Sequence, residues 1–263
     1  MLRIAIPNKG TLSSPAAQML REAGYRQRSS DRDLTCVDSA NDVEFFYLRP
    51  RDIATYVGSG DLALGITGRD LLIDADSGAT EIMDLDFAGS TMRFAAVPGS
   101  VEPPAGLAGH RVATSFPGVV QRHLLDLGVK ADVIADVVET GATLRQVGLV
   151  TVGEPILRSS AVLVGRADNG DLPGVTQLVR RLQGVLVARQ YVMIAYDVPT
   201  ARLDDAVALT PGIESPTISP LHREGWVAVN AMVLRGEVHR IMDELYEVGA
   251  RAILVTDIHA CRL

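Results

Sequence analysis

The 263-residue sequence is poor in cysteine and in aromatic residues, and each scarcity excludes a class of protein. Its two cysteines, Cys36 and Cys261, have no Cys or His partner at metal-ligand spacing, which excludes a disulfide framework and a structural zinc site. Aromatic residues make up 5% of the chain and are not interleaved with basic ones, so a surface that stacks nucleic-acid bases is not indicated. The net charge of −7 has the wrong sign for a protein whose main partner is a phosphate backbone.

Long apolar runs are also missing. No run approaches the roughly 18 residues of a membrane span, and the apolar segment Leu2–Ile6 begins without the successive charged, apolar and small-residue sections of a signal peptide. We therefore expect a cytoplasmic protein that binds neither a membrane nor nucleic acid. Hydrophobic residues at 47% and charged residues at 22% still provide a full core, and the length predicts two domains, or three if one is small.

The first half of the sequence alternates short β-rich runs with helical patterns, which is typical of an α/β lobe built on a parallel, doubly wound sheet. The predicted strands are Arg3–Pro7, Val43–Arg49 and Leu62–Thr67, and the predicted helices are Ser13–Gly24, Pro50–Gly60 and one that begins at Arg69–Ala75. A further strand, Ser90–Val97, leads into the Pro/Gly-rich residues 98–109. This stretch indicates a boundary or a surface loop.

A second, smaller α/β lobe is predicted beyond that stretch, from the strand His110–Phe116, the helix Val119–Leu127 and the strand Asp132–Val138. The strand Ala161–Gly165 then returns to the first lobe, and a polar turn at 169–174 precedes the helix Val175–Gly184. The remaining residues follow the strand, helix, strand, strand, helix, strand order of a ferredoxin-like domain. Its predicted elements are Tyr191–Val198, Thr200–Leu209, Gly212–Ser219, Ala228–Val233, Glu237–Val248 and Ala252–Ile258.

The segment from Asp136 to Thr143 has the most specific chemical pattern. A predicted strand ends in two carboxylates and a Thr-Gly-Ala-Thr turn then opens a helix; the residues are Asp136, Glu139, Thr140, Gly141, Ala142 and Thr143. Backbone N–H groups and hydroxyls at a helix N-terminus bind phosphate, and the carboxylates suit ribose hydroxyls or a phosphate-bound magnesium ion. The pattern therefore indicates a phosphoribosyl site. The alternative is an ordinary capped helix, with Thr140 or Thr143 as its cap.

Polar and charged residues follow each of the first three predicted strands. Lys9, which with Lys130 is one of the two lysines of the chain, stands with Gly10 after the first strand. Arg49 and Arg51 flank Pro50 after the second strand, and Thr67, Gly68 and Asp70 lie at the end of the third. Ligands of open α/β sheets bind at these strand ends, so we expect a mixed-charge crevice suited to a nucleotide. Each residue taken singly also fits a solvent-exposed loop or a surface salt bridge.

Five segments together resemble a known family. They are Arg3–Gly10, Leu48–Gly58, Gly65–Asp70, Asp136–Leu144 and Pro211–Ile218, and in this order they closely resemble the long form of ATP phosphoribosyltransferase, nearly from end to end. The resemblance implies a glycosyltransferase that transfers a pentosyl group in the first step of histidine biosynthesis. ATP would attack phosphoribosyl pyrophosphate through adenine N1 and release pyrophosphate with Mg²⁺ present.

The resemblance also implies the architecture. We expect a two-lobed catalytic part like a periplasmic binding protein, followed by a C-terminal ferredoxin-like (ACT-like) regulatory domain that binds histidine as an inhibitor. Lobe I would comprise residues 1–90 with 155–186, lobe II residues 91–154, and the regulatory domain residues 187–263. A homo-oligomer between a dimer and a hexamer is implied as well.

The family's functional residues are carried over by motif. Lys9, Arg49 and Asp70 are expected to act in catalysis, and the nucleotide is expected to contact Gly10, Arg51, Thr67, Gly68, Gly89 and Ser90. Histidine carries an ammonium, a carboxylate and an imidazole, so its site needs an acid, a hydroxyl and room for the ring. The residues expected there are Asp197, Thr217, Ala231 and Ala252. The alternative for Asp197 is a helix cap before Pro199.

One departure from the family stands out. Relatives have a strand and a helix, with a Gly-x-Val-Glu stretch implicated in the substrate site, between the equivalents of Ala131 and Asp132, which are adjacent here. A parallel crossover through Val119–Leu127 still fits the shorter lobe.

Two other functions agree with parts of the sequence pattern. Prephenate dehydratase has a similar organisation, but its Thr-Arg-Phe motif is absent. A non-catalytic small-molecule-binding protein of the same two-lobed fold would usually have a signal peptide. Release of pyrophosphate from ATP and phosphoribosyl pyrophosphate separates the transferase from both.

Overall fold

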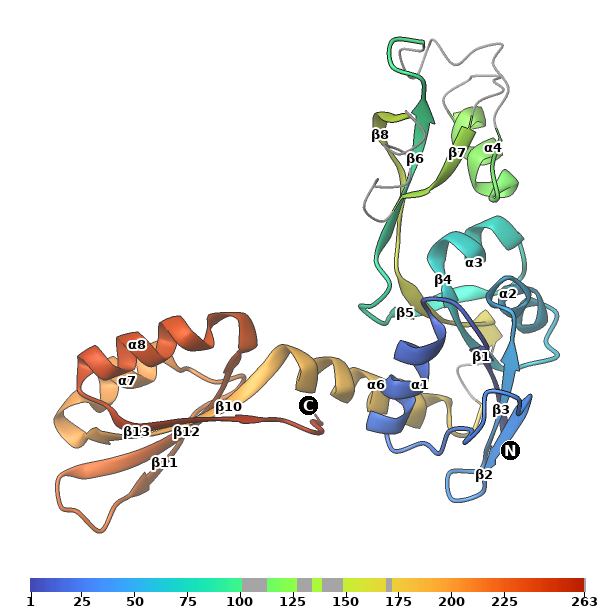
Figure 1. Cartoon of the computed structure of the whole chain (residues 1–263). Coiled ribbons are helices and arrows are strands. Elements are labelled where there is room, and N and C mark those ends of the chain that lie inside the picture. The colour runs from blue at the N-terminus through green and yellow to red at the C-terminus, as the bar shows by residue number, and fades with distance from the viewer. Residues whose placement is uncertain (101–112, 127–133, 139–148, 169–171, 263) are drawn as a thin grey trace. The chain divides into compact units, whose positions relative to one another are not determined.

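The computed structural model describes the chain except for residues 101–112, 127–133, 139–148, 169–171 and 263. It divides into two units, Met1–Val179 and Arg180–Leu263 (Figure 1). The division falls within helix α6 (Val175–Gln190), before the predicted domain boundary at residue 187. None of the described helices combines the length and the apolar character that crossing a bilayer requires.

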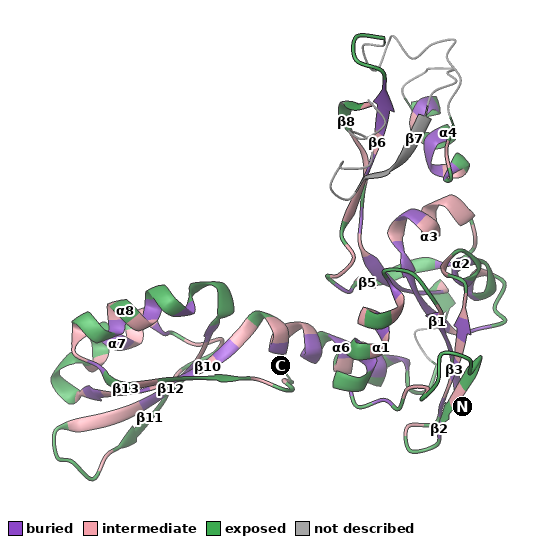
Figure 2. Ribbon diagram, viewed as in Figure 1, coloured by how far each residue is buried: buried purple, intermediate pink, exposed green. Residues whose placement is uncertain are grey.

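A six-stranded sheet forms the centre of the first unit. Its order is β2-β3-β1-β4-β9-β5, with β1 at Leu2–Pro7, β2 at Thr35–Asp38, β3 at Val43–Leu48, β4 at Leu64–Gly68, β5 at Thr80–Asp84 and β9 at Ala161–Gly165. Strand β1 pairs in parallel with β3 and β4, and burial is concentrated on these central strands (Figure 2). Strand β9 returns to this sheet, as the sequence predicts.

The predicted fully parallel sheet is wrong outside that centre. Strand β2 is antiparallel to β3, and β9 is antiparallel to both β4 and β5. Only residues 39–42 connect β2 to β3, and so short a connection permits only an antiparallel pair. Strands β2 and β5 were not predicted at all.

Three helices pack on this sheet: α1 (Ser13–Glu22), α2 (Pro50–Gly58) and α3 (Arg69–Ala75). Helix α2 approaches β4 closely because Gly65 has no side chain. A Cβ built at Gly65 would lie 2.4 Å from Cγ2 of Ile53 and 3.1 Å from Cγ2 of Val57. Both of these residues are fully buried, so the position admits no larger residue without displacing the helix.

The second sheet of the first unit has the order β7-β6-β8 and is antiparallel throughout. Its strands are β6 (Ser90–Ala96), β7 (Ile134–Val138) and β8 (Val150–Ser159). Helix α4 (Pro117–Asp126) packs on it through an apolar cluster that includes Met92, Phe94 and Val120.

This arrangement differs from the prediction in two places. Of the predicted strand His110–Phe116, the described residues 113–116 contain a single β-bridge residue, Thr114, and the rest lies outside the described residues, as does the test of the parallel crossover from that strand to β7. Strand β8 was missed because Gly153 and Pro155 lie inside it, where they signal a turn. They occupy a bulge between the pairs Met92–Leu157 and Phe94–Val152.

The second unit has the ferredoxin-like order that the sequence predicts. Its elements are β10 (Tyr191–Pro199), η3 (Thr200–Arg202), α7 (Leu203–Leu209), β11 (Thr217–Pro220), β12 (Trp226–Leu234), η4 (Arg235–Glu237), α8 (Val238–Val248) and β13 (Arg251–Asp257). The sheet order is β11-β12-β10-β13, and alternate residues of β10 enter the core with α7 and α8.

Helix α6 continues past its predicted end at Gly184. Instead of ending the helix, Gly184 allows the backbone at Cys261 to lie close to α6, because a Cβ at position 184 would lie 2.1 Å from the carbonyl oxygen of Cys261.

Candidate functional site

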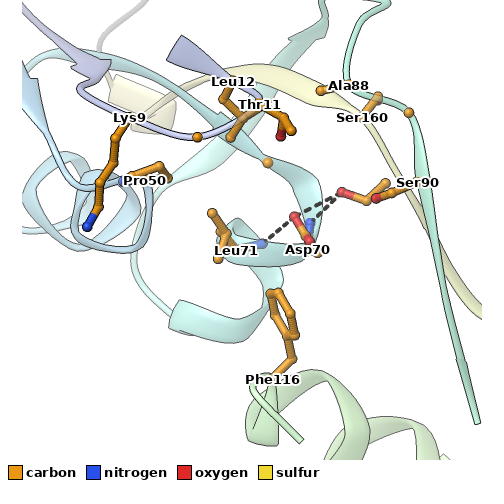
Figure 3. A pocket seen from close by; sticks show the side chains of 14 residues that line it. Lys9, Thr11, Leu12, Pro50, Asp70, Leu71, Ala88, Ser90, Phe116 and Ser160 are labelled. Atoms are coloured by element: carbon orange, nitrogen blue, oxygen red, sulfur yellow. Dashed lines mark hydrogen bonds between the residues drawn. The ribbon is translucent and has the colours of Figure 1, made fainter. Parts of the chain in front are cut away.

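A cavity of about 300 Å³ lies at the carboxyl ends of β1 and β4, beside the segments that connect the two sheets of the first unit (Figure 3). Open α/β sheets bind ligands at this end of their parallel strands. The lining residues are Lys9, Gly10, Thr11, Leu12, Pro50, Gly68, Asp70, Leu71, Ala88, Gly89, Ser90, Phe116, Ser159 and Ser160. The cavity therefore brings together six of the predicted residues, namely Lys9, Gly10, Gly68, Asp70, Gly89 and Ser90.

Asp70 is the most firmly held polar residue of the cavity. It is 9% exposed at the start of α3, and its backbone N–H donates to Oγ of Ser159 at 3.0 Å. The Ser159 hydroxyl donates in return to Oδ1 of Asp70 at 3.0 Å, and the N–H of Leu71 donates to the same oxygen at 2.9 Å. Oδ2 accepts no hydrogen bond from the described residues, so one oxygen of a fixed carboxylate remains for a ligand.

Glycine is required at position 68 for this geometry. A Cβ there would lie 2.3 Å from Oδ1 of Asp70 and would displace the carboxylate. Gly10 has a positive φ of 79°, which bends the chain between β1 and α1, and nothing lies within 4 Å of its would-be Cβ. Both glycines therefore keep the backbone close to the cavity without side chains of their own.

Lys9 is exposed, and its side chain extends along Pro50 rather than toward Asp70 (Figure 3). The neighbouring Asn8 was not predicted. Its Oδ1 is buried and finds no hydrogen-bond partner among the described residues, while its backbone carbonyl accepts a hydrogen bond from Arg28 at 3.3 Å.

Three predicted residues do not line the cavity. Thr67 is fully buried and its hydroxyl donates to the carbonyl of Pro50 at 2.8 Å, which ties the end of β4 to the start of α2. Arg49 is exposed and lies outside the lining. Arg51 donates to the carbonyl of Ser115 and places its guanidinium carbon 5.1 Å from the centre of the Phe116 ring. Ser115 and Phe116 are distant from Arg51 in the sequence, so the pattern of residues at strand ends could not predict these contacts.

Phe116, Ser159 and Ser160 are cavity residues that the sequence analysis missed. Ser159 ends β8 and Ser160 follows it, and this strand was missed because of its Gly and Pro residues. Phe116 directly precedes α4 in a stretch predicted as a strand. The one available signal was the Ser-Ser pair directly before the buried run Ala161–Gly165.

An ionic cluster fixes the junction between β8 and β9. The Arg69 guanidinium donates to both oxygens of Glu81 at 2.8 and 2.7 Å, to Asp84 at 2.8 Å and to the Ser160 hydroxyl at 3.0 Å. The hydrogen bonds to Glu81 and Asp84 raise the pKa of Arg69. Burial opposes ionisation of Asp84, but hydrogen bonds from Arg69, the Asp86 N–H and Ser160 outweigh it and lower the pKa of Asp84. Arg69 and Asp84 are therefore both ionised at neutral pH.

The predicted phosphoribosyl segment is only partly described. Asp136 lies on β7, with its backbone opposite Arg93 of β6. Glu139, Thr140, Gly141, Ala142 and Thr143 lie outside the described residues, so their role stays a prediction. Among the residues that the structure describes, no group of three or more His, Cys, Asp or Glu side chains is arranged to hold a metal ion.

The predicted histidine-binding residues lie in the second unit, and they do not share one face of its sheet. Asp197 lies on β10 opposite Ala228 of β12, and Thr217 lies on the same face, away from α7 and α8. Ala231 is opposite Ile194 and is only 3% exposed, within the core beneath the helices. Ala231 therefore lies on the opposite face of the sheet from Asp197 and Thr217, because Ile194 and Asp197 are an odd number of residues apart along β10 and side chains alternate between faces. That these residues bind histidine stays a prediction. Ala252 is exposed in a bulge of β13 with a φ of 50°.

Matches to two family models and to two relatives extend along most of the chain and indicate one family. The family model described as "ATP phosphoribosyltransferase" matches residues 49–132 and 126–184, and the model described as "HisG, C-terminal domain" matches residues 188–260. An ATP phosphoribosyltransferase of Salinispora tropica is 64% identical, and one of Streptomyces coelicolor is 58% identical; each alignment covers 100% of both chains.

A solved structure, the "ATP phosphoribosyl transferase (HisG:HisZ) complex from Thermotoga maritima", matches with a TM-score of 0.59 and 25% identity over 71% of this chain and 98% of that one. The alignment with the Salinispora relative has 281 positions against the 263 residues here, a difference of 18. Together with the two overlapping matches at 126–132, this confirms that relatives carry a segment that this chain lacks.

Proposed function

The chain belongs to the ATP phosphoribosyltransferase family, and we propose that its nucleotide substrate binds in the cavity beside Asp70. The activity of this family is the transfer of the phosphoribosyl group of phosphoribosyl pyrophosphate to ATP, the first step of histidine biosynthesis. The observation that supports the proposed site is the convergence of Lys9, Gly10, Gly68, Asp70, Gly89 and Ser90, contributed by three separate segments, on one cavity of the catalytic unit.

The chemistry of the transfer sets what this cavity must do. Adenine N1 forms a bond to C1′ of the ribose while the bond from C1′ to the pyrophosphate oxygen breaks, and pyrophosphate leaves with the bonding electron pair. N1 is neutral and pyrophosphate is a good leaving group, so no side chain needs to become covalently attached. Catalysis then rests on alignment and on stabilisation of the developing charge.

The fixed carboxylate of Asp70 suits the alignment role. Oδ1 is held by Ser159 and Leu71, and the remaining oxygen is positioned to accept a hydrogen bond from a ribose hydroxyl of the nucleotide. Lys9 and Gly10 would meet its phosphates, with Lys9 turning from its present course along Pro50.

Magnesium fits this site as a substrate-bound ion. Mg²⁺ in phosphate-transferring sites is commonly held by one or two carboxylates together with substrate oxygens, and Asp70 supplies one carboxylate in the cavity. When bound, the ion would neutralise the pyrophosphate charge. The backbone amides of Gly141–Thr143, with Asp136 and Glu139 near the ribose hydroxyls, would hold the phosphoribosyl donor.

Regulation and assembly are part of the proposal. Histidine would inhibit the enzyme from the second unit, with Asp197 as the partner of its ammonium group and Thr217 as a hydroxyl partner on the same sheet face. The Thermotoga relative is described as a complex, and we infer that the present chain is a homo-oligomer, between a dimer and a hexamer, in the cytoplasm. Light scattering coupled to gel filtration measures that mass directly.

The test of the active site combines two measurements. Mixing the protein with ATP and phosphoribosyl pyrophosphate should release pyrophosphate, and a non-catalytic binding protein would release none. Asp70→Asn should then weaken ATP binding in calorimetry by about 10-fold, the loss expected for a charge-assisted hydrogen bond. Unchanged ATP affinity in Asp70→Asn would exclude this cavity as the nucleotide site.

A further inference from the structure

Helices α3 and α4 meet between the two sheets of the first unit, through a carboxylate that caps a helix to which it does not belong. Asp74, near the end of α3, accepts hydrogen bonds at Oδ1 from the N–H of Gly118 at 2.8 Å and of Val119 at 3.3 Å. These are N–H groups of the first turn of α4, which have no partner within their own helix. The cap therefore joins the six-stranded sheet's helix to the three-stranded sheet's helix.

The environment of Asp74 shows that this contact is built rather than incidental. Its side chain is 11% exposed, and its charge is balanced by the N-terminus of α4 and by Nη1 of Arg51 at 3.5 Å from Oδ2. Gly118 also permits the approach, because a Cβ there would lie 2.8 Å from the backbone oxygen of Asp74. A side chain at that position would push α4 away from α3.

The start of α4 carries Phe116 to the substrate cavity. Phe116 lies directly before the helix, lines the cavity, and points toward Leu71 and Asp70 (Figure 3). The same Arg51 that reaches Asp74 donates to the carbonyl of Ser115 and covers the Phe116 ring. Asp74 and Arg51 thus fix the backbone on both sides of the one aromatic residue among those that line the cavity.

We propose that Asp74 is a positioning residue for nucleotide binding: by capping α4 across the gap between the sheets, it holds Phe116 in place as a wall of the cavity. The proposal rests on the assignment of this cavity to the nucleotide. It makes Asp74 a contributor to ATP affinity, although its side chain does not line the cavity. Loss of the cap should let Phe116 move away from the cavity, and this should weaken nucleotide binding more than it slows the chemical step.

The test compares Asp74→Ala, Asp74→Asn and the control Asp76→Ala in the full-length enzyme. Asp76 lies directly after α3 and forms an ion pair with Arg122 of α4 at 2.9 Å, but it is 85% exposed and caps no N–H of α4. Asp74→Ala should raise KM for ATP by about 10-fold with kcat within about 2-fold, because a cap and a charge-assisted bond are lost. Asp74→Asn keeps an acceptor at Oδ1 and should recover most of the affinity, and Asp76→Ala should match the wild type.

Each other outcome counts against the proposal. A fall in kcat with unchanged KM in Asp74→Ala means a smaller folded fraction and a purely structural role, and equal effects of Asp74→Ala and Asp76→Ala mean general weakening of the helix contact. If Asp74→Ala does not fold, Gly118→Ala decides, since it retains the carboxylate but separates the helices: an unchanged KM there overturns the proposal. Asp70→Asn, measured alongside, shows separately whether the cavity binds ATP at all.

Discussion

At the scale of single residues, the geometry of the candidate cavity depends on hydrogen bonds between groups that are distant in sequence. Ser159 both donates a hydrogen bond to Asp70 and accepts one from it, although the two residues are 89 positions apart in the sequence. The same is true of Thr67 and Pro50, where a buried hydroxyl binds a carbonyl of the next segment. The roles of these small polar side chains follow from their partners rather than from their residue type.

Ser159→Ala should therefore impair nucleotide binding. The substitution leaves the N–H of Asp70 without its acceptor and removes one of the two donors to Oδ1, so the carboxylate is less firmly oriented. We expect ATP affinity to fall by about 3- to 10-fold, the equivalent of one lost side-chain hydrogen bond, as measured by calorimetry. Ser77→Ala is the matched control, because its hydroxyl donates to the carbonyl of Ala54 and does not line the cavity. Equal affinities of Ser159→Ala and the wild type would remove Ser159 from the site.

Thr143→Ala tests the donor half of the site. The Thr143 hydroxyl is expected to contact the 5′-phosphate of phosphoribosyl pyrophosphate, and its removal should weaken donor binding by about 1 to 3 kcal/mol if a charge-assisted bond is lost. ATP affinity, measured in the same preparation, should stay unchanged. A mutant with normal donor affinity would show that the Thr-Gly-Ala-Thr turn is only a helix cap.

At the scale of elements, the Arg69 cluster holds α3, β5 and the β8–β9 junction together. Asp84 has a lowered pKa in the folded protein, so its contribution to stability is complete above its ordinary value near 4 and is lost as the pH falls through the lowered value. Asp84→Asn should cost about 1 kcal/mol of unfolding free energy at pH 7, a small value because its side chain is 47% exposed. In urea titrations the difference from the wild type should shrink below about pH 4. A difference that stays constant with pH would contradict this account.

Helix α2 and strand β4 offer a second test at this scale. Gly65→Ala would place a methyl group against the buried Ile53 and Val57 and should cost about 1 to 3 kcal/mol of unfolding free energy through overpacking. Gly236→Ala is the control, since nothing lies within 4 Å of the position of its Cβ. Chemical denaturation measures the unfolding free energy of both variants. Equal values would mean that α2 moves away from β4 at little energetic cost.

At the scale of the whole molecule, sequence patterns predicted the elements that have a regular local hydrophobic pattern. They missed the elements and residues whose positions depend on contacts with distant parts of the chain. The ferredoxin-like order and the strands β1, β3, β4 and β9 were predicted because their hydrophobic runs are bounded by turn residues. Strand β8 was missed because its bulge interrupts the pattern, and β2 and β5 because edge strands are short and half exposed. The cavity lining was predicted where residues follow strand ends, and missed at Phe116 and Ser159, whose positions depend on the second sheet.

The two faces of the second unit's sheet allow the proposed regulation by histidine to be tested separately from stability. Asp197→Asn, on the face away from the helices, should retain the basal rate and lose inhibition by histidine, because the ligand would no longer distinguish two states of the enzyme. Ala231→Gly, in the core beneath the helices, should lower the unfolding free energy by about 1 kcal/mol and leave inhibition intact. Dose-response curves and thermal melts of both variants measure this. Histidine inhibition at the wild-type concentration in Asp197→Asn would place the regulatory site elsewhere.

The position of β9 in the sheet affects how the chain folds during its translation on the ribosome. Among the described strands, β5 pairs only with β9, and β9 lies between β4 and β5 in the sheet although the chain reaches it after the entire second sheet. At a synthesis rate of about 5–20 residues per second, β5 therefore waits on the order of 5–15 seconds beside the ribosome with both edges open. Completion of the first sheet is a late, non-local event that carries a high loop-closure cost. Slow refolding and a need for chaperones during expression should both originate at β5, and variants that weaken the β5–β9 pair should lower soluble yield more than equilibrium stability.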